Sequence, residues 1–236
     1  MSIEIIPSDQ RGVTQLDWLE SKHSFSFGDY YDPKQIHFGS LRVLNEDRIH
    51  PGGGFGMHPH ANMEIVTLVF QGRLEHKDSI GNHGVIEAGD VQRMSAGSGL
   101  VHSEYNCSKM EGVHLLQVWI EPREKDIAPS YEQKKGILKS NKNQIVPIVS
   151  GAKEKNTIYI HQNSIFSFAL LDPGISVSYE AFKKENGTFI FVVGGEINFN
   201  DIGLRNGDAA KVIGRQSIKL TAKKFSSCLL IEVPMR

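Results

Sequence analysis

The chain of 236 residues contains only two cysteines, Cys107 and Cys228, one in each half of the sequence. Two distant cysteines build no disulfide framework, and such sparse use is typical of a reducing compartment. The formal net charge is −1, so no strong basic field would attract nucleic acid or anionic lipid. A secretion signal and an apolar run of membrane-spanning length are both lacking. We therefore expect a cytoplasmic protein that contacts neither nucleic acid directly nor a membrane.

Helical periodicity is almost absent from the sequence. Short runs of β-branched and aromatic residues alternate with turns rich in Gly, Asn and Asp, which is typical of a β-sandwich or barrel. We expect one short helix, over 14–22, with Thr14 as its N-cap. The expected strands are Ile36–Leu44, Met63–Phe70, Gly84–Ile86, Val91–Met94, Val113–Ile120, Ser176–Phe182, Thr188–Val193, Ala209–Val212 and Cys228–Val233.

The sequence contains an internal repeat of strand, Gly turn, strand and Gly-Asp turn. In the first half Ile65–Leu74 leads on to Ala88–Val91, and in the second half Phe189–Ile197 leads on to Asn206–Ala209. Repeats of this kind indicate that one structural unit occurs twice. The repeat therefore predicts two similar β-barrels.

We expect an all-β fold of two antiparallel, jelly-roll-like barrels packed face to face. Residues 1–132 would form the N-terminal barrel, 133–144 a charged linker, and 145–236 the C-terminal barrel. Chemistry is expected only in the first barrel, because 176–180, where the second copy should carry ligands, contains no His. The second barrel would be structural, or a wall or lid over the first site.

Histidines are concentrated in the first half, and only His161 lies in the second. His58 and His60 form one i, i+2 pair after a glycine-rich stretch, and His102 and Glu104 form another. Residues i and i+2 of a strand point to the same face. If the two strands are neighbours, three imidazoles and a carboxylate converge. Such a donor set predicts a divalent transition-metal site with room for water or substrate.

The other ligand-type residues have simpler interpretations, since an isolated His is usually on the surface or hydrogen-bonded in the core. We expect His23 to be structural, with a hydrogen bond to backbone, and His76 and His83 to lie on the surface beside a turn. His114 could reach either the pocket or solvent. Cys107 is at odd spacing from Glu104, so it should point to the other face and not ligate.

The spacing around the first His pair resembles the first cupin motif, with Gly52, five residues, His58-Pro59-His60 and then Glu64. The second motif is approximated by Gly89, Ser95-Ala96-Gly97, His102 and Asn106. Ser95 replaces its proline, and two extra residues precede His102. These departures resemble the pirin family, as do His23–Phe27, Tyr30–Pro33, Leu41–Asp47 and Gln92–Glu104.

The resemblance is dense from Trp18 to about Gln133, and it is nearest to bacterial pirin-like proteins with quercetin 2,3-dioxygenase activity. It implies a bicupin with a single metal in the N-terminal barrel. The pirin ligands would here be His58, His60, His102 and Glu104, whereas the ordinary cupin carboxylate would be Glu64.

Both carboxylates are present, so the ligand set stays open at this point. Strand parity favours Glu104, which shares a face with His102 without a bulge. Glu64 would then accept a hydrogen bond that orients an imidazole, or be a surface carboxylate at a strand start.

The donor set suits Fe(II), with Mn, Co, Ni, Cu and Zn as alternatives. The resemblance implies a dioxygenase that cleaves a flavonol such as quercetin with O2, with Glu104 as the proton acceptor. Phe55, Met57 and Met94 would line the substrate pocket or simply fill the barrel.

Two other functions remain open from the sequence. The first is a metal-binding, redox-responsive regulatory protein that binds a protein partner without turnover. The second is a cupin isomerase or sugar-phosphate enzyme, for which Arg73 and Arg93 are the only nearby phosphate-binding side chains.

Overall fold

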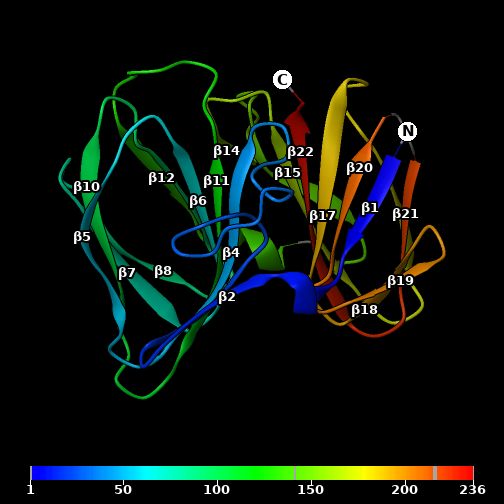
Figure 1. Cartoon of the computed structure of the whole chain (residues 1–236), viewed down its shortest axis with the longest axis horizontal. Helices are drawn as coiled ribbons and strands as arrows, with labels where there is room; N and C mark the ends of the chain where they lie inside the picture. The colour runs from blue at the N-terminus through cyan, green and yellow to red at the C-terminus, as the bar shows by residue number, and fades with distance from the viewer. Residues whose placement is uncertain (1, 141, 215–216, 236) are drawn as a thin grey trace.

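The computed structural model describes residues 2–140, 142–214 and 217–235, and it is almost entirely β (Figure 1). Within these residues, the only helical segments are two 3-10 turns, η1 (Ser8–Gln10) and η2 (Ile137–Lys139). No helix in this part of the chain is long and apolar enough to cross a membrane. The strands are β1 (Ser2–Ile6), β2 (Gly12–Leu16), β3 (Leu19–His23), β4 (Leu41–Ile49), β5 (Gly54–His60), β6 (Glu64–Gln71), β7 (Arg73–Asp78), β8 (His83–Glu87), β9 (Val91–Ser95), β10 (Leu100–Asn106), β11 (Val113–Ile120), β12 (Ser130–Lys134), β13 (Ile145–Ser150), β14 (Ile158–Tyr159), β15 (Ile165–Leu171), β16 (Ser176–Glu180), β17 (Asn186–Gly194), β18 (Glu196–Phe199), β19 (Ile202–Arg205), β20 (Ala209–Ile213), β21 (Ser217–Ala222) and β22 (Ser226–Pro234).

Each half of the molecule is built from one seven-stranded and one four-stranded sheet. In the first half the sheet orders are β12-β9-β6-β11-β4-β3-β2 and β5-β10-β7-β8. In the second half they are β1-β20-β17-β22-β15-β13-β14 and β16-β21-β18-β19. The matching arrangement, with the first half on the left of Figure 1 and the second on the right, confirms the expected pair of barrels.

The first strand of the chain belongs to the second barrel. β1 pairs antiparallel with β20, from Ser2 opposite Ile213 to Ile6 opposite Ala209. β1 is thus an exception to the expected division of the chain into residues 1–132, 133–144 and 145–236. The rest of that division remains a prediction.

The two seven-stranded sheets face each other across one continuous apolar core. Val66 and Leu116 of the first barrel belong to the same buried cluster as Phe189 of the second. The Phe189 ring lies 5.5 Å from that of Phe25 and 6.1 Å from that of Phe38, centroid to centroid. Full burial of such a side chain contributes about 1.5–3 kcal/mol, so this core holds the barrels face to face.

Strand alternation divides the side chains of the first seven-stranded sheet between two environments. On β11, Leu116 and Val118 point into the core between the barrels, whereas Gln117 lines the inside of the first barrel. On β4, Leu44 faces the core and Asn45 lines the inside. The sheet is therefore buried on both faces, and its inner face carries polar groups.

The expected helix over 14–22 is wrong, because this segment forms the hairpin β2–β3. Leu19, Ser21 and His23 are buried and alternate with partly exposed neighbours, which is strand periodicity. β3 pairs along its whole length with β4, so tertiary pairing overrides local helix propensity. The strand expected over Ile36–Leu44 begins later, at Leu41, and continues to Ile49.

Candidate metal centre

Three of the four predicted ligands converge inside the first barrel. β5 and β10 are antiparallel neighbours, with His102 opposite His58 and Leu100 opposite His60. The ring centroids are 4.4 Å apart for His58 and His102, and 4.9 Å apart for His60 and each of the other two. One ring nitrogen from each residue lies within 4.8 Å of the others. The expected neighbouring strands therefore bring the imidazoles together.

The chemistry of the three imidazoles suits a metal ion. The Nδ1–H of His58 donates to the Gly56 carbonyl oxygen at 2.7 Å, which leaves Nε2 with a free lone pair. Nε2 of His102 is buried and has no hydrogen-bond partner among the described residues. Burial and the neighbouring imidazoles lower the pKa of His60 to about 4 and that of His102 to about 2. Neutral imidazoles with unused lone pairs are what metal ligation requires.

Glu104 reaches the cluster from the side of His102. A Glu104 oxygen lies within 4.8 Å of nitrogens of His102 and His76. The pairing of β10 with β5 is irregular between His102 and Glu104, whereas the pairing with β7 is regular, with Glu104 opposite His76. The extra residue lies in β5, because Phe55 to His58 spans one position more than His102 to Glu104 opposite it, so β10 itself has no bulge and Glu104 shares the inner face with His102 as expected. Its ligation remains a prediction.

A short hydrogen-bonded chain holds the Glu104 carboxylate. Nε1 of Trp119 donates to Oε1 of Gln117 at 3.0 Å, and Nε2 of Gln117 donates to Oε2 of Glu104 at 2.8 Å. The indole thus fixes which end of the Gln117 amide faces Glu104. In the metal-free protein, burial raises the pKa of Glu104 to about 7.

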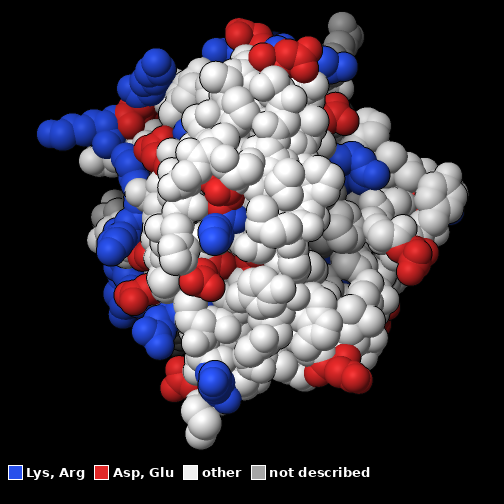
Figure 2. Space-filling model, turned by 90° about the vertical axis from the view of Figure 1, so that its left-hand side faces the viewer, with Lys and Arg blue, Asp and Glu red and all other residues white. Residues whose placement is uncertain are grey.

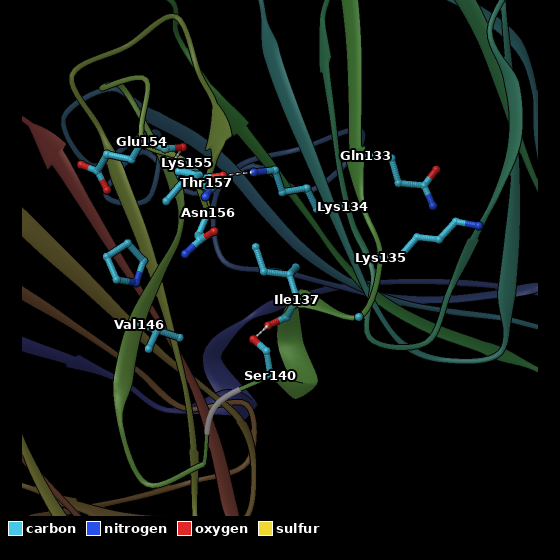
Figure 3. Close-up of a pocket in the computed structure, with 12 residues that line it drawn as sticks. Gln133, Lys134, Lys135, Ile137, Ser140, Val146, Glu154, Lys155, Asn156 and Thr157 are labelled. Carbon is cyan, nitrogen blue, oxygen red and sulfur yellow. Dashed lines mark hydrogen bonds between the residues drawn. The ribbon is translucent and has the colours of Figure 1, made fainter.

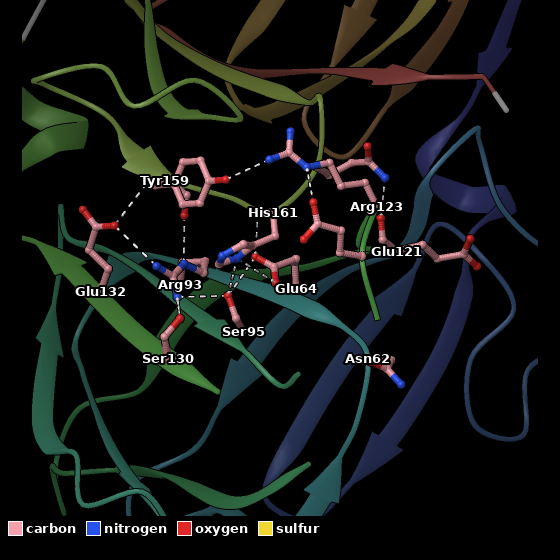
Figure 4. Close-up of polar contacts among 12 residues, drawn as sticks. Asn62, Glu64, Arg93, Ser95, Glu121, Arg123, Ser130, Glu132, Tyr159 and His161 are labelled. Carbon is pink, nitrogen blue, oxygen red and sulfur yellow. Dashed lines mark hydrogen bonds and ion pairs between the residues drawn. The ribbon is translucent and has the colours of Figure 1, made fainter. Parts of the chain in front are cut away.

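Glu64 lies elsewhere, at the junction of the two barrels (Figure 4). Its Oε2 accepts hydrogen bonds from Ser95 Oγ at 2.9 Å and from the His161 backbone N–H at 3.1 Å. Figure 4 shows Arg93 beside this group, where its Nε donates to the Tyr159 carbonyl oxygen at 2.9 Å. The expectation that Glu64 orients a ligand imidazole or lies on the surface is wrong, because the start of β6 faces the second barrel.

Three of the remaining histidines, His76, His23 and His114, differ from expectation. His83 is exposed, as expected, but His76 is completely buried on β7. The expectation for His76 is wrong because β7 turns it into the barrel, between Leu74 and Asp78, which are buried as well. His23 is hydrogen-bonded, but to the side chains of Thr14 and Asn45 rather than to backbone.

His114 reaches neither the pocket nor solvent but a buried ion pair between the barrels. Its Nε2 lies 3.0 Å from Oε1 of Glu46, whose Oε2 accepts a hydrogen bond from Arg11 Nη1 at 2.8 Å. The Arg11 guanidinium lies 4.9 Å from the ring centroid of Phe191 in the second barrel. Burial alone would raise the pKa of Glu46, but the hydrogen bond with His114 and the Arg11 charge lower it to about 2.

A cavity of about 390 Å³ opens from the histidine cluster. Its walls include the aromatic rings of Trp18, Phe27, Phe55 and Trp119. Met57, in contrast, is 57% exposed, and Met94 fills a separate buried cluster. Every described lining residue lies within 14–119, so the expectation that the second barrel forms a wall or lid is wrong.

The inner wall carries polar residues that motif analysis missed. Asn45 and Asp47 of β4 and Gln117 of β11 all line the cavity. Ser21 Oγ donates to Oδ1 of Asp47 at 2.5 Å, and burial raises the pKa of Asp47 to about 6. The sequence did carry a signal for these residues, because polar side chains alternate with apolar ones along these strands.

A larger hollow of about 850 Å³ lies beside the linker (Figure 3). Its lining does not suit the binding of a metal ion. It is lined by residues between Gln133 and Thr157, including Lys134, Lys135 and Lys155. Among the described residues, neither group of three or more His, Cys, Asp or Glu side chains suited to a metal lies there. The smaller cavity is therefore the better candidate for catalysis.

Comparisons with known proteins agree with this geometry. The sequence profile described as pirin matches residues 7–120, and that of the quercetinase C-terminal cupin domain matches 147–233. The quercetin 2,3-dioxygenase of Escherichia coli (strain K12) is 40% identical over 228 residues, which cover 96% of this chain and 96% of that protein.

Solved structures agree as well. The crystal structure of the bacterial pirin YhhW from Escherichia coli, in complex with nickel(II), superposes with a TM-score of 0.94 at 36% identity, covering 100% of both chains. A quercetin 2,3-dioxygenase from Acinetobacter baumannii shares the fold, with a TM-score of 0.77 at 21% identity, covering 95% of this chain and 84% of that one. With its two barrels and its histidine cluster, this chain belongs to the pirin family.

Proposed function

We propose that this pirin is a metal-dependent dioxygenase that cleaves a flavonol such as quercetin with O2. The observation that carries the proposal is the cluster of three imidazoles with a buried carboxylate at an aromatic-lined cavity. The relative from Escherichia coli that is named quercetin 2,3-dioxygenase supports the same class of substrate.

The residues that would hold the ion are His58, His60, His102 and Glu104. Fe(II) is the ion we propose, with Mn, Co, Ni, Cu and Zn as alternatives, because an N3O donor set does not discriminate among them by affinity alone. The nickel(II) complex of YhhW supports binding of a first-row ion in this fold. When bound, such an ion would lower the pKa of a substrate hydroxyl and hold substrate and dioxygen at one place.

Glu104 is the residue we propose as proton acceptor for the substrate hydroxyl. The hydrogen bond from Gln117 to Oε2 of Glu104 fixes the orientation of the carboxylate that would accept this proton. The carboxylate is 3% exposed, and solvent therefore competes little for that proton. A positioned general base of this kind typically contributes about 10²–10⁴-fold to the rate.

The cavity walls suit a flat polyhydroxylated aromatic molecule. A volume of about 390 Å³ lies in the range of small-molecule pockets, and the rings of Trp18 and Phe55 meet edge to face at 5.0 Å. Polar groups of Ser21, Asn45 and Asp47 line another part of the wall, where they can hydrogen-bond to substrate hydroxyls. Apolar walls also keep water from the reacting groups.

The decisive experiment combines elemental analysis of the purified protein with oxygen uptake on quercetin, against anaerobic controls. Glu104→Gln should retain much of the metal but lose about 10²–10⁴-fold in kcat/KM, because an amide cannot accept the proton. Glu75→Gln, on an exposed side chain of β7, is the matched control and should behave as wild type. Equal activity of Glu104→Gln and wild type, at matched metal content, would remove Glu104 from the proton transfer.

A regulatory role is the second candidate, and one observation favours it. Figure 2 looks onto the side of the molecule that carries β5 and β10, where uncharged side chains cover most of the face and a small group of acidic and basic side chains lies left of its centre. Met57 and Tyr105, which are 57% and 40% exposed, lie on those two strands. A protein that binds metal stoichiometrically but consumes no oxygen with any flavonol or catechol would favour binding of a protein partner over catalysis.

A further inference from the structure

A buried carboxylate lies behind the histidine cluster, on the strand next to β10. Asp78 ends β7, and its side chain is fully buried. Its Oδ1 accepts hydrogen bonds from the backbone N–H groups of Ile80 and Asn82, at 3.1 and 2.8 Å. Its Oδ2 accepts a third from Nδ2 of Asn82 at 2.9 Å. A carboxylate that receives three N–H donors is ionised and acts only as an acceptor.

This acceptor determines which nitrogen of His76 carries the proton. Nε2 of His76 lies 3.2 Å from Oδ2 of Asp78, so it must be the N–H donor. In a neutral imidazole the other nitrogen is then an acceptor, and Nδ1 of His76 presents its lone pair to the ring beyond. The His76 side chain is 1% exposed, so water does not compete for that lone pair.

The ring that faces Nδ1 of His76 belongs to His102. The two Nδ1 atoms lie 3.5 Å apart, at the long end of the hydrogen-bond range, and the ring centroids are 5.3 Å apart. Since Nδ1 of His76 is an acceptor, Nδ1 of His102 must be the donor. Nε2 of His102 is thereby left unprotonated, and it is the buried nitrogen that lacks a hydrogen-bond partner in the described part of the chain.

We propose that Asp78 and His76 are positioning residues that fix the tautomer of His102, so that its Nε2 is delivered to the metal as a lone pair. This inference rests on the proposed metal site. We call the chain of hydrogen bonds from Asp78 through His76 to His102 the relay. The turn between β7 and β8 sets its direction, because backbone N–H groups of this turn donate to Asp78 and keep it an acceptor. Partners of this kind typically contribute about 10–100-fold to metal affinity.

Asp78→Asn tests the relay with little change in shape. An amide can donate to Nε2 of His76, which would reverse both ring tautomers and put a proton on Nε2 of His102. The matched control is Glu75→Gln, because Glu75 also contacts a histidine, His83 at 2.8 Å, on the exposed side of the same hairpin.

The measurement is calorimetric titration of the metal-free full chain with Ni(II). Asp78→Asn should raise the dissociation constant about 10–100-fold, whereas Glu75→Gln should leave it unchanged. Circular dichroism and thermal unfolding of the metal-free variants report whether the barrel is intact. An intact Asp78→Asn protein with wild-type affinity would overturn the relay.

A second measurement needs no substitution and so survives any failure of Asp78→Asn to fold. Long-range ¹H–¹⁵N correlation spectra of metal-free wild type, with ¹⁵N-labelled histidine, report the protonated nitrogen of each ring. We expect His102 with its proton on Nδ1 and His76 with its proton on Nε2. The opposite tautomer of His102 would overturn the proposal.

The stoichiometry separates positioning from direct ligation. One potential ligand atom from each of His76, His102 and Glu104 lies within 4.8 Å of the other two, so these residues could also share an ion. Two Ni(II) ions per chain, with one lost in His76→Phe, would make His76 a ligand and overturn its positioning role. Absence of any Ni(II) binding by wild type would contradict the proposed function, but the tautomer spectra would still decide the relay.

Discussion

Asp47 and Glu46 are neighbours on β4 whose pKa values shift in opposite directions, because burial raises that of Asp47, whereas His114 and Arg11 outweigh the effect of burial on Glu46. Asp47 lines the cavity, and burial raises its pKa from 3.8 to about 6. At about 1.4 kcal/mol for each pH unit, this shift corresponds to about 3 kcal/mol. For a raised pKa, the stabilisation by the neutral acid is fully present below the unfolded value and is lost as pH rises through the folded value. Asp47 therefore destabilises the fold above about pH 6.

Asp47→Asn removes this titration while keeping an oxygen that can accept from Ser21. The variant should become more stable relative to wild type as the pH rises. The difference between their unfolding free energies should grow by about 3 kcal/mol from below about pH 4 to above about pH 6. Urea unfolding of the metal-free proteins at a series of pH values, followed by tryptophan fluorescence, measures this difference. The slope of each transition must stay constant for the comparison to hold.

Glu46→Gln is the counterpart with the opposite sign. The pKa of Glu46 is lowered from 4.5 to about 2, so its stabilisation is present above about pH 4.5 and is lost as pH falls toward 2. The variant should therefore be less stable than wild type by about 3 kcal/mol at neutral pH, and less so in acid. A pH-independent difference for both variants, or the same sign for both, would refute the reasoning.

Three further substitutions test other parts of the structure. His60→Ala should abolish stoichiometric metal by elemental analysis yet leave the circular dichroism spectrum intact; loss of the fold would instead make the metal structural. Gly54→Ala should weaken Ni(II) binding in calorimetry, because the new Cβ would clash with the Glu104 carbonyl oxygen and push β5 away from β10; wild-type affinity would contradict this. Phe189→Ala should cost about 3–5 kcal/mol in urea unfolding, since it empties the core between the barrels, and a loss below 1 kcal/mol would contradict that packing.

The histidine cluster was predictable because its information is local. The i, i+2 spacing of His58 and His60 fixes a common face. That their strand lies beside the strand of His102 was only a condition of the prediction, and the structure meets it. The role of Glu64 was not predictable. The alternation of side chains along a strand tells on which face a residue lies, but it does not tell which part of the protein packs against that face. In the structure that face meets His161 of the second barrel.

The relay behind His102 was missed for a related reason. The strand that carries His76 and Asp78 has the sequence Arg-Leu-Glu-His-Lys-Asp, whose charged residues hide its alternation. The hairpin β2–β3 was missed because Gln15 to Glu20 read locally as helix, and only pairing with β4 decides otherwise. Long-range pairing is the part of the fold that a single sequence specifies least directly.

The placement of β1 has a consequence for how the chain folds during synthesis. Ser2 to Ile6 are synthesised well before Ala209 to Ile213, which form their partner strand. The first barrel can therefore form while β1 is still unpaired, and the sheet of the second barrel closes only after β20 has been synthesised. A fragment cut at the linker would leave the edge of β20 bare, and bare edges invite aggregation. β1 thus ties the two halves together, because it precedes the first barrel in the sequence but pairs within the second.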